Sequence, residues 1–159
     1  MERVTITLIK DVFYFTLLAF LSMKLSILCM LVFTDFTTAE SVDYSSLLVQ
    51  ERKTHFVHLL YLVFFSPILE TLIFCVFIYS VCQRITENKY IFILCSTLTF
   101  STFHLVKEGH IGFILLYTSF GGLLFSYNYQ KQIRRHGKSI AIGTTLFIHA
   151  AANLAVNFV

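Results

Sequence analysis

Residues 56–82 read FVHLLYLVFFSPILETLIFCVFIYSVC, an apolar run of 27 residues whose only charged side chain is Glu70. About 20 apolar residues in a helix span the hydrocarbon core of a bilayer. This run is therefore long enough to cross a membrane as one helix. Pro67 precedes Glu70 by three residues. Because proline lacks a backbone N–H and its ring clashes with the preceding turn, it predicts a kink near the middle of that helix.

Four further apolar runs follow the same pattern, at residues 12–33, 90–106, 111–129 and 140–159. Together with the first run they predict an all-α fold, a multi-pass transmembrane helical bundle of about five membrane helices. A polar loop is expected at 34–53. We therefore expect residues 1–54 to form an N-terminal membrane anchor helix with its polar loop, and residues 55–159 to form a four-helix core.

The composition supports a membrane protein and excludes several other classes. Hydrophobic residues make up 57% of the chain and charged residues 13%, about half the share of a soluble domain, roughly 25%. The mean hydropathy is +0.76. A net charge of +3 is too small to indicate nucleic acid, so the bilayer is the expected partner. The cysteines lie in apolar stretches without a CxxC pair, which gives no support to a disulfide framework: Cys29, Cys75, Cys82 and Cys95.

Lysine and arginine in the short loops predict the orientation, because they are enriched on the cytoplasmic side. With the N-terminus inside, three cations fall on the outer side, and eight fall on the inner side: Arg3, Lys10, Arg84, Lys89, Lys131, Arg134, Arg135 and Lys138. We therefore expect a cell-membrane protein with a cytoplasmic N-terminus. The last four of these cations predict a basic loop before the fifth span.

Four polar side chains lie inside the predicted spans: Glu70, His104, His149 and Asn153. A charged side chain at the bilayer centre costs roughly 2.5–3.5 kcal/mol on insertion scales, so such residues usually face the bundle interior and carry function. His149 and Asn153 are four residues apart, which places them on one helix face. Alternate helices run in opposite directions, so all four side chains are expected to share one layer of the bundle.

Three of these segments resemble the motifs of one family. PILETLIF at 67–74, FSTFH at 100–104 and HAAAN at 149–153 are similar, in order and spacing, to the motifs of the CPBP intramembrane proteases. This family comprises CaaX proteases and bacteriocin-processing proteins and is also called the Abi domain. Its first motif usually reads EExxxR. In this chain Thr71 occupies the position of the second acid and Cys75 that of the arginine.

The resemblance implies a glutamic-type intramembrane endopeptidase that needs no metal or cofactor. Glu70 would activate a water with the help of His104, and His149 with Asn153 would form the oxyanion site. The expected substrates are small membrane-associated peptides or small membrane proteins, such as prenylated, pheromone or bacteriocin-type precursors. Two histidines and a glutamate can also bind catalytic zinc. However, the HExxH spacing is absent, so zinc is the weaker alternative.

Two other functions are compatible with the same residues. The departures at Thr71 and Cys75 would fit a catalytically inactive family member that acts in bacteriocin self-immunity or in partner binding. More remotely, membrane Glu and His residues serve proton relays, and membrane histidines bind haem, so a small proton or ion carrier or a haem protein is a third alternative.

Overall fold

The computed structural model describes residues 2–37, 59–108 and 112–157, and within these ranges every element is a helix and none is a strand. The all-α prediction is therefore confirmed. Four of the helices are long and regular: α1 (Glu2–Thr37), α6 (Lys89–Glu108), α7 (Gly112–His136) and α8 (Lys138–Asn157). The polar loop predicted at 34–53 is helical up to Thr37, and the rest of it lies outside the described residues.

The helix that contains Glu70 changes its winding along its length. It runs without a break through η1 (Tyr61–Phe65), α4 (Ser66–Glu70), η2 (Thr71–Phe77) and α5 (Ile78–Ile85), and both η segments are π-helical. π-Helical turns are rare and often mark functional sites. Pro67, which predicts a kink, lies just after the first of these turns. The helix therefore changes its winding next to the residue that lacks a backbone N–H.

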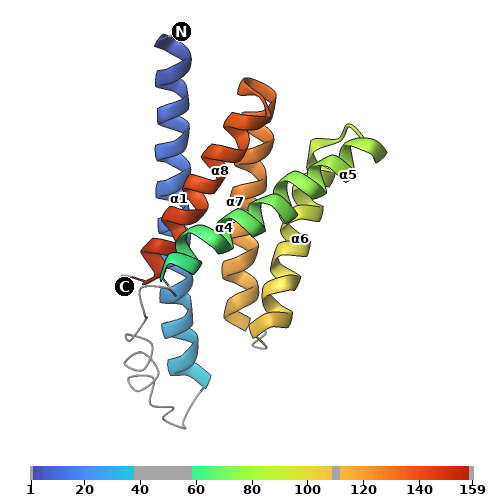
Figure 1. Ribbon diagram of the computed structural model, residues 1–159. Coiled ribbons are helices and arrows are strands. Elements are labelled where there is room, and N and C mark those ends of the chain that lie inside the picture. The colour runs from blue at the N-terminus through green and yellow to red at the C-terminus, as the bar shows by residue number, and fades with distance from the viewer. Residues whose placement is uncertain (1, 38–58, 109–111, 158–159) are drawn as a thin grey trace.

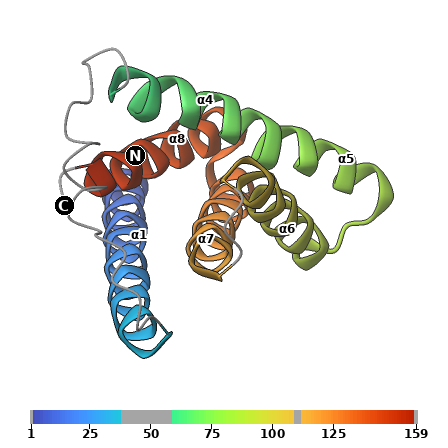
Figure 2. The same ribbon diagram turned by 90° about the horizontal axis from the view of Figure 1, so that it is seen from below.

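The helices pack around α7. Figure 1 shows α6 on one side of α7 and α8 on the other, and α1 packs against both α7 and α8. Seen from below, the α4–α5 segment lies across α8, α7 and α6 in turn (Figure 2). This arrangement brings the middle of the Glu70 helix over the place where α6, α7 and α8 come together.

A closely packed core holds these helices together. Phe92, Tyr129 and Ile148 are fully buried between them. Gly122 on α7 allows a close approach to α6, because a Cβ atom there would lie 3.1 Å from the Thr97 Cα. Small residues at such a position let two membrane helices pack tightly.

The outer faces of the helices are apolar, as a bilayer requires. Phe13, Phe65 and Val106 expose 70%, 63% and 79% of their surface, which suits lipid contact. Among the described residues, three helical stretches are long and apolar enough to cross a membrane: Thr5–Ser22, Tyr61–Ile85 and Lys89–Lys107. That α7 and α8 also cross, as the five predicted spans require, stays a prediction.

The prediction of a basic loop at 131–138 was wrong. α7 continues through this segment to His136, and only Gly137, with a φ of 86°, separates it from α8. Positive φ suits glycine because it has no Cβ. The basic residues stay helical because cations favour a helix C-terminus, and Lys131 Nζ lies 2.8 Å from Asp11 Oδ1 on α1.

Candidate active site

Glu70 lies at the end of α4, between the two π-helical turns, and is 8% exposed. Its carboxylate is contacted by side chains from its own helix, from α6 and from α8. Oε2 lies 3.2 Å from His149 Nε2 on α8 and 3.4 Å from His104 Nε2 on α6. Oε1 accepts a hydrogen bond from the hydroxyl of Ser66, one turn earlier on the same helix. The structure thus brings together three of the four predicted site residues.

Aromatic rings hold the two imidazoles in place. The ring of Phe125 on α7 stacks on His149 with centroids 4.2 Å apart and planes inclined by 24°. The ring of Phe100, one turn before His104 on α6, lies 4.6 Å from that imidazole. Because these rings also pack against each other, at 6.0 Å, both histidines have little freedom to turn away from Glu70.

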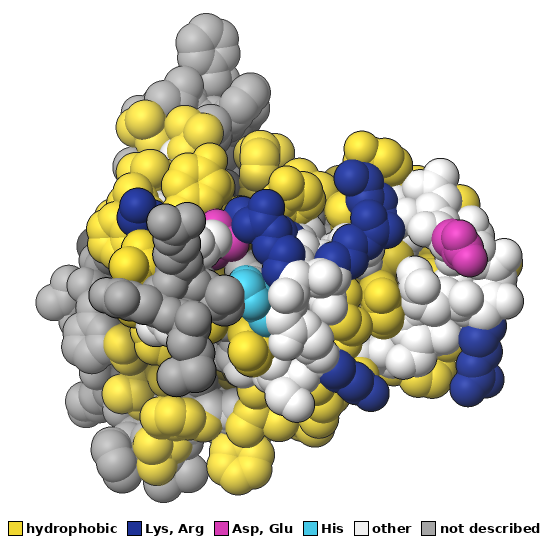
Figure 3. Space-filling model, turned by 90° about the horizontal axis from the view of Figure 1, so that it is seen from above, with side chains coloured by type: hydrophobic (Ala, Val, Ile, Leu, Met, Phe, Trp, Pro, Cys, Tyr) yellow, Lys and Arg dark blue, Asp and Glu magenta, His cyan; other side chains and the backbone are white. Residues whose placement is uncertain are grey.

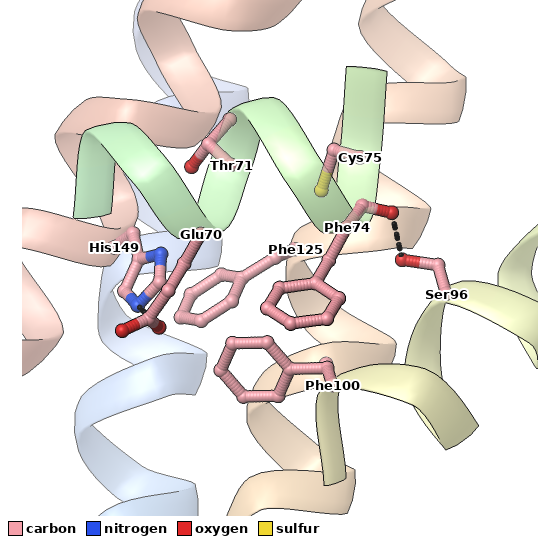
Figure 4. Close-up of a pocket in the computed structure, with 9 residues that line it drawn as sticks. Glu70, Thr71, Phe74, Cys75, Ser96, Phe100, Phe125 and His149 are labelled. Atoms are coloured by element: carbon pink, nitrogen blue, oxygen red, sulfur yellow. Dashed lines mark hydrogen bonds and ion pairs between the residues drawn. The ribbon is translucent and has the colours of Figure 1, made fainter. Parts of the chain in front are cut away.

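A small cavity adjoins the carboxylate (Figure 4), with room for about one water molecule. Glu70 and His149 lie on one side of it, and the rings of Phe74, Phe100 and Phe125 lie on the other. The remaining wall residues are Thr71, Cys75, Ser96 and Gly122. The Glu70 carboxylate and the His149 imidazole therefore adjoin an apolar, narrow cavity, and His104 approaches the same carboxylate without being part of the cavity wall.

Asn153, the fourth predicted site residue, has a different partner. Its Nδ2 donates to the backbone carbonyl of Leu62 at 2.9 Å. The π-helical register explains why this carbonyl accepts a side chain: the N–H of Ser66 donates to Tyr61, and the next residue, Pro67, has no N–H to offer Leu62. Asn153 therefore satisfies a carbonyl that the proline leaves without a backbone donor.

The second π-helical turn is supported in the same way. The hydroxyl of Ser96 on α6 donates to the carbonyl of Phe74 at 2.7 Å, as Figure 4 shows by a dashed line. Hydroxyls in membrane helices commonly bond back to their own helix, so the sequence alone indicated no contact between helices for this serine. Ser66 did carry a signal, since it lies four residues before Glu70 and hence on the same helix face.

The two departures from the family motif are both buried. Thr71 and Cys75 are each 2% exposed, and both line the cavity. The Thr71 hydroxyl has no hydrogen-bond partner within the part of the chain that the structure describes. The space next to Glu70 that a second acid and an arginine would occupy is therefore filled here by a small hydroxyl and a thiol, neither of which carries the charge of the residue it replaces.

A family model for the type II CAAX prenyl endopeptidases, Rce1-like, matches residues 52–155. The matched segment includes Glu70, His104, His149 and Asn153. Comparison with curated proteins and with solved structures finds no significant match in either. The matched model describes membrane endopeptidases, in agreement with the apolar helices of the structure. From the order of its motifs and from this match, the chain belongs to the Rce1-like family of type II CAAX prenyl endopeptidases.

Proposed function

We propose that this protein is an intramembrane endopeptidase in which Glu70 activates the attacking water. The observation that carries the proposal is the approach of two imidazole Nε2 atoms, at 3.2 and 3.4 Å, to a single oxygen of a buried carboxylate. A carboxylate buried inside an apolar bundle carries a free-energy cost of burial. A role as general base beside a water-sized cavity explains why a carboxylate is present despite that cost.

The reaction needs only groups that the chain supplies. The water oxygen attacks the carbonyl carbon of the peptide bond while one of its protons passes to Glu70. His104 holds the water, and His149 and Asn153 donate hydrogen bonds to the oxyanion that forms. The C–N bond then breaks, the leaving nitrogen takes the proton from Glu70, and the carboxylate is restored. The contact of Asn153 with Leu62 sets the orientation of its amide.

The surroundings of the site favour an apolar substrate. The cavity wall includes three phenylalanine rings and is largely apolar, and the outer faces of the helices are suited to lipid. We propose that the substrate is a small membrane-associated peptide, such as a prenylated, pheromone or bacteriocin-type precursor. The family match to CAAX prenyl endopeptidases makes a prenylated peptide with a C-terminal CAAX sequence the first probe to use.

The decisive variant is Glu70→Gln, which keeps the shape of the side chain and removes the base. Cleavage of a fluorogenic prenylated CAAX peptide by protein in lipid nanodiscs should fall by about 100-fold or more. Glu87→Gln is the matched control, because Glu87 is exposed in the turn between α5 and α6, and it should cleave like the wild type. Full activity of the Glu70→Gln protein would refute the proposed role of Glu70.

A second candidate function follows from Thr71 and Cys75, which replace the second acid and the arginine of the usual motif. In that case the protein would be an inactive member that binds a partner or protects against a bacteriocin. The variants Glu70→Gln and His104→Ala separate the two functions. An inactive member would cleave no peptide, and its binding or protection would survive both Glu70→Gln and His104→Ala.

A further inference from the structure

The two oxygens of the Glu70 carboxylate have different neighbours. Oε2 is the oxygen that both imidazoles approach. Oε1 accepts the hydrogen bond from Ser66, whose side chain is itself buried, with 8% of the residue exposed. A glutamate side chain has three rotatable bonds, so a carboxylate held at only one oxygen could still turn about its last bond. The hydroxyl at Oε1 leaves Oε2 directed at the histidines.

Ser66 differs from other hydroxyl residues in the helices of this protein. Thr16, Ser80 and Thr144 each donate to the carbonyl four residues earlier in their own helix, at 2.8 Å, which is the usual behaviour of Ser and Thr within a helix. Ser66 donates forward, to a side chain four residues later. Its local backbone is unusual as well, because its N–H belongs to the π-helical turn that precedes Pro67.

The chain has few other groups that could orient this carboxylate. Thr71 and Cys75, at the motif positions of the second acid and the arginine, are uncharged, and Figure 4 shows both at the cavity. Among the described residues, the contacts of the carboxylate with hydroxyl and imidazole groups come from Ser66, His104 and His149. Of these three residues, only Ser66 contacts Oε1; the two histidines approach Oε2, the oxygen proposed to take the proton.

We propose that Ser66 is a positioning residue for Glu70. Its hydroxyl holds Oε1, and this keeps Oε2 in the orientation from which it takes the proton of the attacking water. The inference rests on the proposed function of Glu70. A residue that orients a base acts on the chemical step and not on substrate binding, because the ground-state contacts of the substrate are unchanged.

The kinetic test compares Ser66→Ala, Ser66→Thr and Ser80→Ala in nanodiscs with the fluorogenic prenylated peptide. Ser66→Ala should lower kcat by about 10-fold or more, with KM within about 2-fold of the wild type. Ser66→Thr keeps the hydroxyl and should restore most of kcat. Ser80→Ala removes an exposed hydroxyl that only bonds back to Val76 and should have no effect. A kcat of Ser66→Ala close to wild type, or a rise in KM alone, would overturn the proposal.

A second measurement does not depend on activity. Thermal unfolding of the wild type, Ser66→Ala, Glu70→Ala and the double variant forms a cycle that reports the coupling between the two side chains. Ser66→Ala should lower the unfolding temperature in the wild type and have little effect once Glu70 is replaced. Equal effects in both backgrounds would overturn the Ser66 contact. If the wild type cleaves no peptide while the coupling is present, the proposed function fails and the contact stands.

Discussion

Glu70 is held by a hydroxyl from its own helix and by imidazoles from two others. Ser66 donates a hydrogen bond to one carboxylate oxygen, and the two imidazole nitrogens lie 3.2 and 3.4 Å from the other, so both oxygens have close polar partners. A buried charge without such partners would be strongly destabilising. At the scale of single residues, the carboxylate at the centre of the site therefore has close polar partners, while one buried hydroxyl at its edge has none among the described residues.

That hydroxyl belongs to Thr71, and it leads to a prediction about stability. A buried polar group without a partner costs about 1–3 kcal/mol, so Thr71→Val, which replaces the hydroxyl by a methyl group of similar size, should raise the unfolding free energy by an amount in that range. Thermal unfolding in detergent micelles measures the change. Thr97→Val is a matched comparison, because the Thr97 hydroxyl on α6 is also buried without a partner in the described chain but does not line the cavity.

The two variants together show whether the cavity is dry. If both raise the unfolding temperature, the Thr71 hydroxyl has no partner in the working protein. If Thr97→Val stabilises and Thr71→Val destabilises, the expectation for Thr71 is wrong, and a water in the adjoining cavity is the partner that the valine removes.

At the scale of elements, the π-helical turns on both sides of Glu70 are tied to neighbouring helices by side chains. Asn153 on α8 binds the carbonyl of Leu62, and Ser96 on α6 binds the carbonyl of Phe74. A backbone carbonyl without a donor is costly in a bilayer, where no water can replace it. Both carbonyls lie in π-helical turns, and each of the two hydrogen bonds helps to fix the Glu70 helix against a helix that carries a histidine.

The link between Pro67 and Asn153 gives the second stability prediction. Asn153→Ala removes the donor to Leu62 and should destabilise the protein by about 1–3 kcal/mol, since the carbonyl is left unsatisfied. Pro67→Ala restores a backbone N–H in the helix. In the Pro67→Ala background, Asn153→Ala should therefore cost clearly less, a coupling of about 0.5–3 kcal/mol.

Thermal unfolding of the four proteins in this cycle measures that coupling. If the two substitutions change the unfolding free energy additively, the Leu62 carbonyl gains no donor when the proline is replaced. Pro67 would then not be the reason that this carbonyl accepts a hydrogen bond from Asn153.

At the scale of the whole molecule, most of the described lysine and arginine side chains lie at one end, while Lys24 and Lys107 lie elsewhere. Figure 3 looks onto the end that carries the N-terminus, and lysine and arginine side chains extend across it. The C-terminal part of α7 and the turn between α5 and α6 lie at this end as well (Figure 1). Five of the described lysines and arginines at this end are exposed: Lys10, Arg84, Arg134, Arg135 and Lys138. This grouping is what the positive-inside pattern requires of a bundle whose N-terminus is cytoplasmic.

The predicted topology can be tested with reporter fusions in bacteria. Five spans with the N-terminus inside place the C-terminus outside, so alkaline phosphatase fused after Val159 should be active and a fluorescent protein fused there should be dark. After Gly137, between α7 and α8, the phosphatase fusion should be inactive and the fluorescent protein bright, because the basic residues keep that turn in the cytoplasm. The same result at both positions would show that α8 does not cross the membrane.

Much of this protein was determined by the sequence itself. The all-α fold follows from apolar runs too long and continuous for a soluble domain, because only a helix satisfies its own backbone in lipid. Burial cost singles out Glu70, since a carboxylate inside such a run needs a reason to be there. The spacing of His104 and His149 within their motifs indicated their membership of one site, and they lie together at Glu70 in the structure. The division at residue 54 and the catalytic roles stay predictions.

Other features were decided only by the tertiary structure. Asn153 and Leu62 are separated by 91 residues, and Ser96 and Phe74 by 22, so no local pattern predicts either contact. Lys131, in the basic segment through which α7 continues, contacts Asp11 of α1, which is 120 residues away in the sequence. The reason is the same in each case: a polar group takes whichever partner the packing of the helices brings near. Periodicity shows which face a residue occupies, and only the fold shows what lies opposite that face.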